Sequence, residues 1–220
     1  MADWSKEKIQ KFVSNLKDLH THEKLGQFYD DFAPQYDKAV KSFGYVGPSI
    51  AVKLLNKYVK SKDAWILDVA AGTGLVGEYL VDSGYTNIDA VDGSVASTEV
   101  ARKKNIYKHL YVQWLGGDNK LNTNNEGYDA LVCVGGFALN QLKSDVFPEF
   151  IRVVKPGGFI VINIRTNWLD REASYSDGKF ERDMAQMETN RKWKLIEKYL
   201  DIQQEESVNQ DSVTFIHQVC

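Results

Sequence analysis

The sequence predicts an α/β fold built on a doubly wound, mostly parallel sheet, and two observations lead to this prediction. From Ala64 onward, short apolar runs such as AWILDVA, NIDAVD and GFIVINI alternate with segments of helical periodicity. Strands separated by helices of this length are joined by right-handed crossovers and therefore run parallel. The segments KWKLIEKYLDIQQ and DSVTFIHQV have no long helix between them, which predicts a closing antiparallel hairpin.

Length and composition are those of one ordinary globular domain. The chain has 220 residues, 43% of them hydrophobic and 12% aromatic, and no Gly-, Ser- or Pro-rich linker divides it. We expect a single domain over residues 1–220, with an N-terminal helical lid in 1–62 and the α/β core in 63–220. Residues 5–20 have the apolar spacing of an amphipathic helix, and KLGQFYDDFAPQYDKAVKSFGY predicts short helices with a turn at Pro34.

Charge and cysteine content exclude several classes of partner. A net charge of −3 argues against nucleic-acid and membrane partners, both of which attract an excess of Lys and Arg. Cys133 and Cys220 form no disulfide framework, and MADWSKEKIQKF has no apolar run of signal-peptide length, so we expect a cytoplasmic protein. His20 and His22 do not share a helical face, and we expect no metal site.

The stretch ILDVAAGTGLVG contains the G-x-G-x-x-G spacing of a dinucleotide-binding loop. Any strand that turns tightly into a helix favours this spacing, so the neighbouring residues must identify the ligand. Asp68 ends the strand, where its carboxylate repels a pyrophosphate but suits the ammonium and sulfonium of S-adenosylmethionine. The alternative is that Asp68 only accepts hydrogen bonds from loop amides. Gly77 then serves close packing of the first helix on the sheet.

Acidic residues also stand at the ends of the next two strands. Asp92 ends NIDAVDGS and can accept both ribose hydroxyls of an adenosyl ligand, a role shared by NAD sites. Gly93 lets the backbone approach closely, and Ser94 either contacts the ligand or is simply a helix N-cap. The strand HLYVQWL leads into GGDN, where Asp118 and Asn119 can meet the adenine, although GGDN read alone is an ordinary turn.

In this order, LDVAAGTG, AVDGS, GGDN, YDALVCVGGF and KPGGFIVI resemble the motifs of class I S-adenosylmethionine-dependent methyltransferases over roughly residues 63–165. YDDFAPQYD, VGGFALNQ and INIRTN are similar to the methyltransferase-like subfamily of the Williams-Beuren syndrome region. The resemblance implies a Rossmann-like seven-stranded sheet in the order 3-2-1-4-5-7-6 with the last strand antiparallel, and S-adenosyl-L-methionine as cofactor. The expected cofactor contacts are Tyr29, Tyr36, Asp68, Ala70, Gly72, Thr73, Gly74, Asp92, Gly93, Ser94, Gly117, Asp118, Asn119 and Val134.

Methyl transfer from a sulfonium depends on the position of the acceptor more than on acid–base chemistry. The protein has to hold an N, O or S nucleophile about 3 Å from the methyl carbon and exclude water, so no catalytic residue is identified. The candidates for aligning or deprotonating an acceptor are Tyr36, Asn140, Asn163, Arg165, Asn167 and Trp168. We expect residues 167–190, which are polar, to complete a mobile lid with the N-terminal helices and to select the substrate.

Other functions stay open. An NAD(P)-dependent reductase would need a helical Tyr-x-x-x-Lys pair, but Tyr175 and Lys179 lie in a predicted turn, while Tyr58 and Lys62 precede the glycine motif. A non-catalytic regulatory protein that binds S-adenosylmethionine or S-adenosylhomocysteine is a second alternative. The fourth strand leads into CVGG, with neither an Asn/Asp-Pro-Pro-Tyr motif nor a Pro-Cys pair. We therefore expect a small-molecule acceptor, with a protein acceptor as the other possibility.

Overall fold

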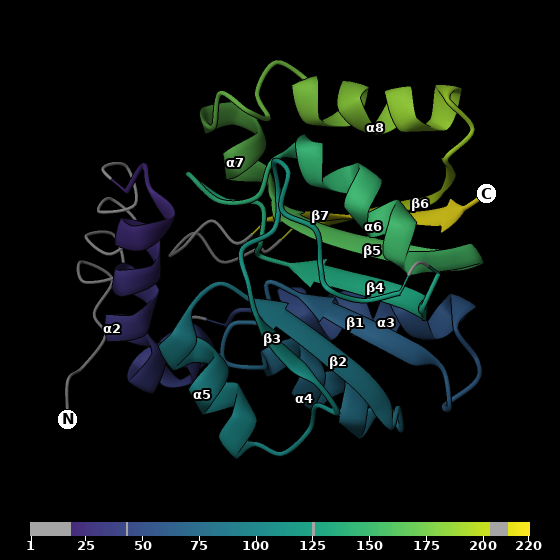
Figure 1. The fold of residues 1–220 in the computed structure, drawn as a ribbon. Helices are drawn as coiled ribbons and strands as arrows, with labels where there is room; N and C mark the ends of the chain where they lie inside the picture. The colour runs from purple at the N-terminus through teal and green to yellow at the C-terminus, as the bar shows by residue number, and fades with distance from the viewer. Residues whose placement is uncertain (1–18, 43, 125, 203–210) are drawn as a thin grey trace.

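Seven strands form one sheet in the order β3-β2-β1-β4-β5-β7-β6, which confirms the predicted order (Figure 1). The computed structural model describes residues 19–42, 44–124, 126–202 and 211–220, so the helix expected over residues 5–20 lies almost entirely outside them. Strands β1 to β5 run parallel, whereas β7 is antiparallel to both β5 and β6. The strands are β1 (Trp65–Val69), β2 (Asn87–Asp92), β3 (Leu110–Val112), β4 (Tyr128–Val134), β5 (Val154–Arg165), β6 (Trp193–Asp201) and β7 (Ser212–Val219).

Helices pack on both faces of this sheet. They are α2 (His22–Ser42), α3 (Gly47–Tyr58), α4 (Leu75–Asp82), α5 (Val95–Lys103), the short 3-10 helix η2 (Ser144–Val146), α6 (Phe147–Val153), α7 (Thr166–Arg171) and α8 (Lys179–Thr189). Buried side chains of α3 and α4 form one apolar cluster with the sheet, and those of α6 and α8 form another with its other face. Figure 1 shows the resulting three layers, with α8 above the sheet and α3 and α4 below it.

Strand β4 shows why its sequence is apolar from Ala130 to Val134. Successive side chains of a strand point to opposite faces, so Leu131 and Cys133 join the cluster beneath α6 and α8, while Ala130 and Val132 join the cluster beneath α3 and α4. A strand buried on both faces has no position for a polar side chain toward solvent. The Cys133 side chain within this strand is fully buried.

Helix α2 corrects the expectation of short helices separated by a turn. It is continuous from His22 to Ser42 with Pro34 inside it, although a proline removes one backbone hydrogen bond and costs about 3 kcal/mol in a helix interior. Tertiary contacts offset this cost, because Leu25, Phe32 and Val40 are buried on its inner side. The helix packs against α5, and Figure 1 shows it beside α5, apart from the helices that cover the two faces of the sheet.

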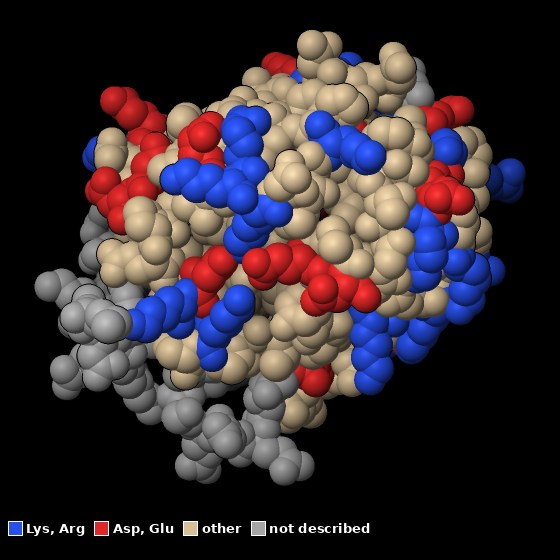
Figure 2. All heavy atoms as spheres, turned by 90° about the horizontal axis from the view of Figure 1, so that it is seen from below, with Lys and Arg blue, Asp and Glu red and all other residues tan. Residues whose placement is uncertain are grey.

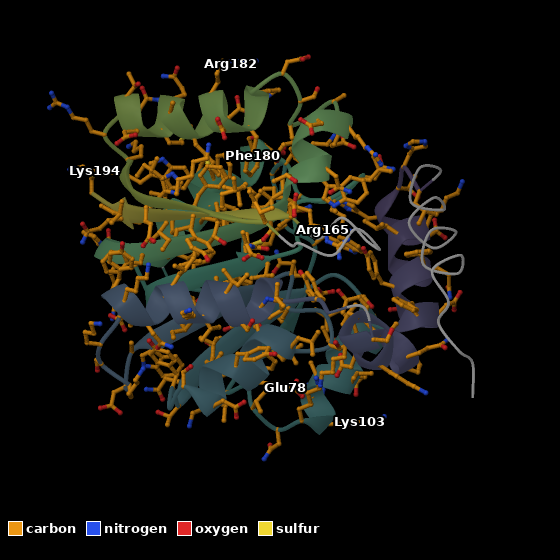
Figure 3. The ribbon with its side chains drawn as sticks, turned by 180° about the vertical axis from the view of Figure 1, so that it is seen from behind. Glu78, Lys103, Arg165, Phe180, Arg182 and Lys194 are labelled. Carbon is orange, nitrogen blue, oxygen red and sulfur yellow. The ribbon has the colours of Figure 1, made fainter. Side chains whose placement is uncertain are left out.

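The expectation that residues 167–190 form a mobile lid is wrong for most of this segment. Tyr175, Phe180 and Met184 are buried in the core, and the ring of Phe180 meets that of Phe137 edge-to-face at 5.0 Å between centroids. Figure 3 shows Phe180 on the side of α8 that faces the sheet. The many charged residues of the segment occupy the outer face of α8, which is why its average polarity was misleading.

The surface gives no sign of a single dominant charge on the face drawn in Figure 2, where Lys and Arg side chains alternate with Asp and Glu. This distribution agrees with the small net charge of −3. Among the described residues, none of the helices combines the length and the apolar character that crossing a membrane requires.

Candidate active site

A cavity lies between α2 and the carboxyl ends of β1, β2 and β4, which is where ligands bind in open α/β sheets. Its empty space, including the part that opens to solvent, is about 850 Å³. The predicted residues that line it are Tyr29, Tyr36, Ala70, Gly72, Thr73, Asp92, Gly93, Val134 and Asn140. These predicted residues are therefore brought together, although they come from α2, β2, β4 and the loops that follow β1, β2 and β4.

Asp92 connects the second strand with the glycine loop. One carboxylate oxygen accepts a hydrogen bond from the Gly72 amide and the other from the Ser94 amide, both at 2.8 Å. Burial raises the pKa of Asp92, and these hydrogen bonds act in the opposite direction by stabilising the charged form. Asp92 faces the cavity, so its remaining lone pairs are available to the hydroxyl groups of a ligand.

The glycine loop presents backbone rather than side chains to the cavity. Ala70 and Gly72 both have a φ of 55°, in the left-handed region, and Ala70 is strained there because it has a Cβ atom. The Thr73 hydroxyl donates to the Asp37 carboxylate of α2 at 2.5 Å. Gly74 precedes α4 and packs near the Tyr107 ring instead of lining the cavity.

Asp68 does not line the cavity, and the structure favours the supporting role that the sequence left open. Its carboxyl is fully buried, and the Tyr107 hydroxyl donates to it at 2.6 Å. Burial raises the pKa of Asp68 to about 7, since the charged form has lost its hydration. Gly77 is needed for the same contact, because a Cβ atom there would lie 2.4 Å from the Tyr107 hydroxyl oxygen. The predicted packing role of Gly77 was against the sheet, whereas its close neighbours are the side chains of Tyr107 and Ile106 in the loop before β3.

The residues predicted to contact the adenine lie outside the cavity. The GGDN turn folds away from the cavity: the Gly117 amide donates to the Asp145 carboxylate at 2.8 Å, and Asn119 pairs with Gly116. Gly117, Asp118 and Asn119 do not line the cavity, whereas Gln113, Trp114 and Leu115 do. The reason is that β3 ends at Val112, so the three residues after it reach the strand end first.

Trp114 is the main site residue that the sequence reasoning missed. A Cβ atom on Gly93 would lie 2.3 Å from a Trp114 ring atom, so the tight fit of the indole requires glycine at that position. On the α2 side, the His22 ring stacks on Trp114 with 4.7 Å between centroids. The sequence HLYVQWL contained a signal for this role, because its tryptophan lies just beyond the end of β3.

Ser94 is the N-cap of α5, as its alternative interpretation stated, and it does not line the cavity. Its Oγ accepts from the Ser97 amide at 3.1 Å and donates to the Asp30 carboxylate of α2 at 2.6 Å. Asp30 also accepts from the Ala96 amide at 2.9 Å, at the first turn of α5. Because an anion is stabilised at a helix N-terminus, these contacts hold α2 against α5.

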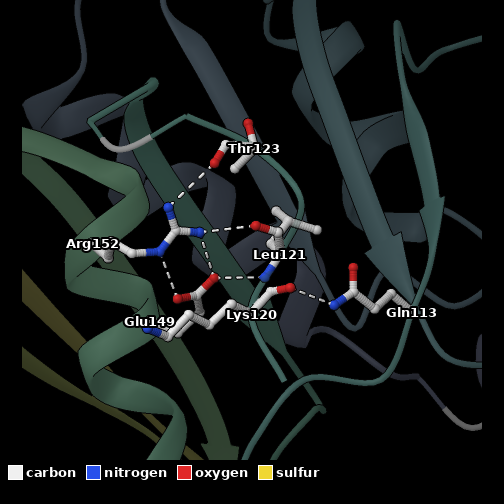
Figure 4. A network of polar contacts seen from close by, with 6 residues as sticks. All are labelled: Gln113, Lys120, Leu121, Thr123, Glu149 and Arg152. Carbon is white, nitrogen blue, oxygen red and sulfur yellow. Dashed lines mark hydrogen bonds and ion pairs between the residues drawn. The ribbon is translucent and has the colours of Figure 1, made fainter. Parts of the chain in front are cut away.

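The loop after β3 is tied to α6 by the ion pair of Glu149 and Arg152, whose nitrogen and oxygen atoms approach to 2.6 Å (Figure 4). Glu149 also accepts from the Leu121 amide at 2.7 Å, and Arg152 donates to the carbonyl oxygens of Leu121 and Thr123. These contacts fix the far end of the loop that begins with Trp114.

The candidate acceptor residues separate into two groups. Asn140 lines the cavity beside Gln141, whose amide donates to the Tyr29 hydroxyl. Asn163, Arg165, Asn167 and Trp168 do not line it. Asn163 donates to Ser212 and Thr214 inside the sheet, and Trp168 belongs to the core.

Three other possibilities for chemistry are weakened by the structure. The Tyr175 hydroxyl is buried and donates to the Ala138 and Leu142 carbonyl oxygens, so it is not poised as the acid of a reductase. Burial raises the pKa of the Cys133 thiol, which disfavours a thiolate nucleophile. Within the described ranges, no group of three or more His, Cys, Asp or Glu side chains could hold a metal ion.

Comparison with known proteins finds similarity to methyltransferases. A family model described as a methyltransferase domain matches residues 66–158. The chain is 37% identical over 142 residues to Methyltransferase-like protein 27 of Homo sapiens, which covers 64% of this chain and 57% of that protein. It is 28% identical over 155 residues to the ubiquinone/menaquinone biosynthesis C-methyltransferase UbiE of Campylobacter jejuni, which covers 66% of this chain and 64% of that protein.

The fold is shared with solved structures at low sequence identity. An S-adenosylmethionine-dependent methyltransferase of Leishmania major superposes with a TM-score of 0.67 at 15% identity, covering 97% of this chain and 91% of that chain. The chain spans less than two thirds of the length of the curated relatives named above. The human relative confirms the resemblance to the methyltransferase-like subfamily. In its motifs, its strand order and these matches, the chain is similar to the class I S-adenosylmethionine-dependent methyltransferases, and the matched methyltransferase domain spans residues 66–158.

Proposed function

We propose that the chain transfers a methyl group from S-adenosylmethionine to an N, O or S atom of a small-molecule acceptor. The observation that carries the proposal is the position of Asp92, a cavity-facing carboxylate that also holds the glycine loop through the Gly72 amide. This arrangement suits a ligand that joins a ribose to a positively charged amino-acid end.

The lining residues suggest how the cofactor would be oriented. Asp92 would accept the ribose hydroxyls, Trp114 would lie against the adenine, and Ala70 and Gly72 would contact the methionyl end. Tyr29 and Tyr36 come from α2, and aromatic faces of this kind attract a sulfonium as they attract other cations. When bound, the cofactor supplies an already activated methyl group, so the chain needs to position the acceptor and exclude water.

The acceptor is proposed to be small because the cavity is covered by α2. The cavity's polar side chains, such as Asn140 and Gln141, lie beneath this helix, so the side chain of a protein substrate would have to pass α2 to reach them.

The described cysteines, Cys133 and Cys220, are free thiols, which supports a reducing compartment such as the cytoplasm.

Calorimetric titration with S-adenosylhomocysteine tests the cofactor assignment. We expect binding to the unmodified chain and a loss of about 10- to 100-fold in affinity for Asp92→Ala, since hydrogen bonds to a charged group contribute about 1.5–3 kcal/mol. Asp82→Ala removes an exposed carboxylate from the last turn of α4 and should leave the affinity unchanged. Failure of the unmodified chain to bind, or equal affinity of Asp92→Ala, would contradict the proposal.

Turnover separates an enzyme from a protein that only binds the cofactor. Incubation with S-adenosylmethionine and a metabolite extract should release S-adenosylhomocysteine at a rate that rises with extract concentration. Tight binding without any release would identify a regulatory binding protein instead.

A further inference from the structure

Arg165 places a positive charge at the carboxyl end of β5. It is the last residue of β5, and Figure 3 shows it on the side where α2 lies. Its guanidinium carbon lies 5.4 Å from the centroid of the Tyr45 ring. No ion pair of Arg165 with a carboxylate occurs within the part of the chain that the structure describes.

Tyr45 connects this guanidinium with the cavity. A Cβ atom on Gly135 would lie 2.9 Å from the Tyr45 hydroxyl oxygen, and Gly135 lines the cavity at the end of β4. Neither Tyr45 nor Arg165 lines the cavity itself, but the Tyr45 hydroxyl lies directly behind Gly135 of the cavity wall and its ring lies against Arg165. Tyr29 and Tyr36 approach the same region from α2.

The three phenols act as hydrogen-bond donors at neutral pH. Burial raises the pKa of Tyr29, Tyr36 and Tyr45, so each hydroxyl keeps its proton. The positive charge of Arg165 opposes this rise in all three. A guanidinium together with O–H donors is complementary to an anionic ligand group.

Position in the sheet separates Arg165 from the glycine loop. The glycine loop follows β1, whereas Arg165 is the last residue of β5, and β4 lies between these two strands. At a spacing of about 4.8 Å per strand, the two strand ends are about 10 Å apart. The carboxylate of the cofactor would lie near the glycine loop, so a second anion is needed to match Arg165.

We propose that the methyl acceptor carries a carboxylate and that Arg165 binds this carboxylate, with the phenols of Tyr29, Tyr36 and Tyr45 around it. The proposal rests on the proposed methyltransferase function. A planar guanidinium fork matches the two oxygens of a carboxylate better than an ammonium does. In the transfer, the acceptor's lone pair forms the new bond to the methyl carbon, the sulfur keeps the electron pair of the broken C–S bond, and any acceptor proton leaves to water.

Matched acceptor pairs test this assignment. Amino, hydroxy and thiol carboxylic acids are compared with their methyl esters and with the corresponding phosphate monoesters, using release of S-adenosylhomocysteine as the readout. We expect the acids to exceed their esters at least tenfold in kcat/KM. Arg165→Gln should lower kcat/KM for the acids by about 10- to 100-fold, mainly through KM, and Arg165→Lys should restore part of it.

Two controls separate the outcomes. Arg171→Gln removes an exposed arginine from the last turn of α7 and should change nothing. S-adenosylhomocysteine affinity should stay within about threefold in Arg165→Gln, because a larger loss would assign Arg165 to the cofactor carboxylate and overturn the proposal.

Direct binding covers the case in which none of the tested acids is methylated. The acids are titrated into the chain loaded with S-adenosylhomocysteine, with fluorescence of Trp114 in the cavity as the signal. Binding of acids that Arg165→Gln abolishes would support the proposal. Preference for esters or phosphates, or no binding of any acid, would overturn it, while failure to bind S-adenosylhomocysteine would instead contradict the proposed function.

Discussion

At the scale of single residues, two carboxylates at neighbouring strand ends have different roles. Asp92 faces the cavity and accepts from two backbone amides, whereas Asp68 is fully buried beneath the glycine loop. The same side-chain chemistry therefore contributes to ligand binding in one case and to loop support in the other. Their surroundings, rather than their positions in the motif, determine which role each one has.

The buried Asp68 predicts a dependence of stability on pH. Folding raises its pKa from an ordinary 3.8 to about 7, so between these values the folded chain keeps a proton that the unfolded chain has lost. Its contribution to the free energy of unfolding is therefore fully present below about pH 4 and is lost as the pH rises to about 7. Asp68→Asn cannot ionise, so its melting temperature relative to the unmodified chain should rise by several degrees between pH 5 and pH 8.

Melting curves followed by circular dichroism at several pH values measure this difference. Asp82→Asn makes the same carboxylate-to-amide change at an exposed position, so its difference in melting temperature from the unmodified chain should not vary with pH. A constant difference for Asp68→Asn as well would mean that Asp68 is ionised throughout this range.

Sequence reasoning identified the residues whose role depends on a local motif. Asp92, Ala70 and Gly72 follow directly from the strand-to-loop pattern, and the structure places all three at the cavity. Trp114 was missed because its position depends on where β3 ends, and the end of a strand is set by pairing with β2 rather than by local sequence. For the same reason, the adenine contacts were expected in the GGDN turn and not in the residues directly after β3.

At the scale of elements, α2 is held over the cavity by two carboxylates of its own. Asp30 contacts the first turn of α5, and Asp37 accepts from the Thr73 hydroxyl and from the Lys104 ammonium, the latter at 2.7 Å. The Asp37 side chain is 27% exposed and that of Lys104 is 17% exposed, so the pair is shielded enough to contribute to docking.

Loss of the Asp37 carboxylate should loosen α2. Asp37→Asn removes the charge that pairs with Lys104, at a cost of about 1–2 kcal/mol, so amide hydrogen exchange in α2 should accelerate about 5- to 30-fold. S-adenosylhomocysteine affinity should fall as well, because α2 supplies part of the cavity wall. Asp31→Asn makes the same change at an exposed neighbour on this helix and is the matched control. Equal exchange rates in the two variants would show that Asp37 does not hold the helix.

The N-terminal lid was predicted from sequence in outline only. The aromatic and acidic stretch YDDFAPQYD gave its location, but Pro34 suggested a break that tertiary packing prevents. Residues 167–190 were assigned to the lid for their polarity, which conceals Tyr175 and Phe180 on the buried side. Average composition does not show which face of a helix is covered.

At the scale of the whole molecule, the Glu149–Arg152 pair links the loop after β3 to the core helix α6. Glu149 is 9% exposed at its side chain, so removal of its charge breaks a largely buried ion pair with Arg152. Glu149→Gln should lower the free energy of unfolding by about 2–3 kcal/mol, since breaking a largely buried pair costs more than breaking a surface pair.

Chemical denaturation measures this loss against a surface pair of the same type. Glu99 and Arg102 are also three residues apart, but both side chains are more than half exposed, so Glu99→Gln should cost less than about 0.5 kcal/mol. Comparable losses in the two variants would contradict the importance of burial for the Glu149–Arg152 pair.

The overall fold was the most predictable level. Alternation of apolar runs with helical segments gave the parallel sheet, and the family resemblance gave its complete order. The antiparallel hairpin of β6 and β7 also agreed with the prediction, because its two strands leave no room for a crossover helix.

The contacts of Tyr175 distinguish the two walls of the cavity. Its hydroxyl donates to the carbonyl oxygens of Ala138 and Leu142, while its ring lies in the aromatic core against Phe137 and Phe180. The turn between these carbonyls bears Asn140 and Gln141, so this wall moves only when the core itself opens. The opposite wall, α2, is attached to α5 and to the glycine loop by Asp30 and Asp37 as well as by its buried apolar residues. We therefore expect this helix, and not the turn held by Tyr175, to move when cofactor and acceptor enter and leave.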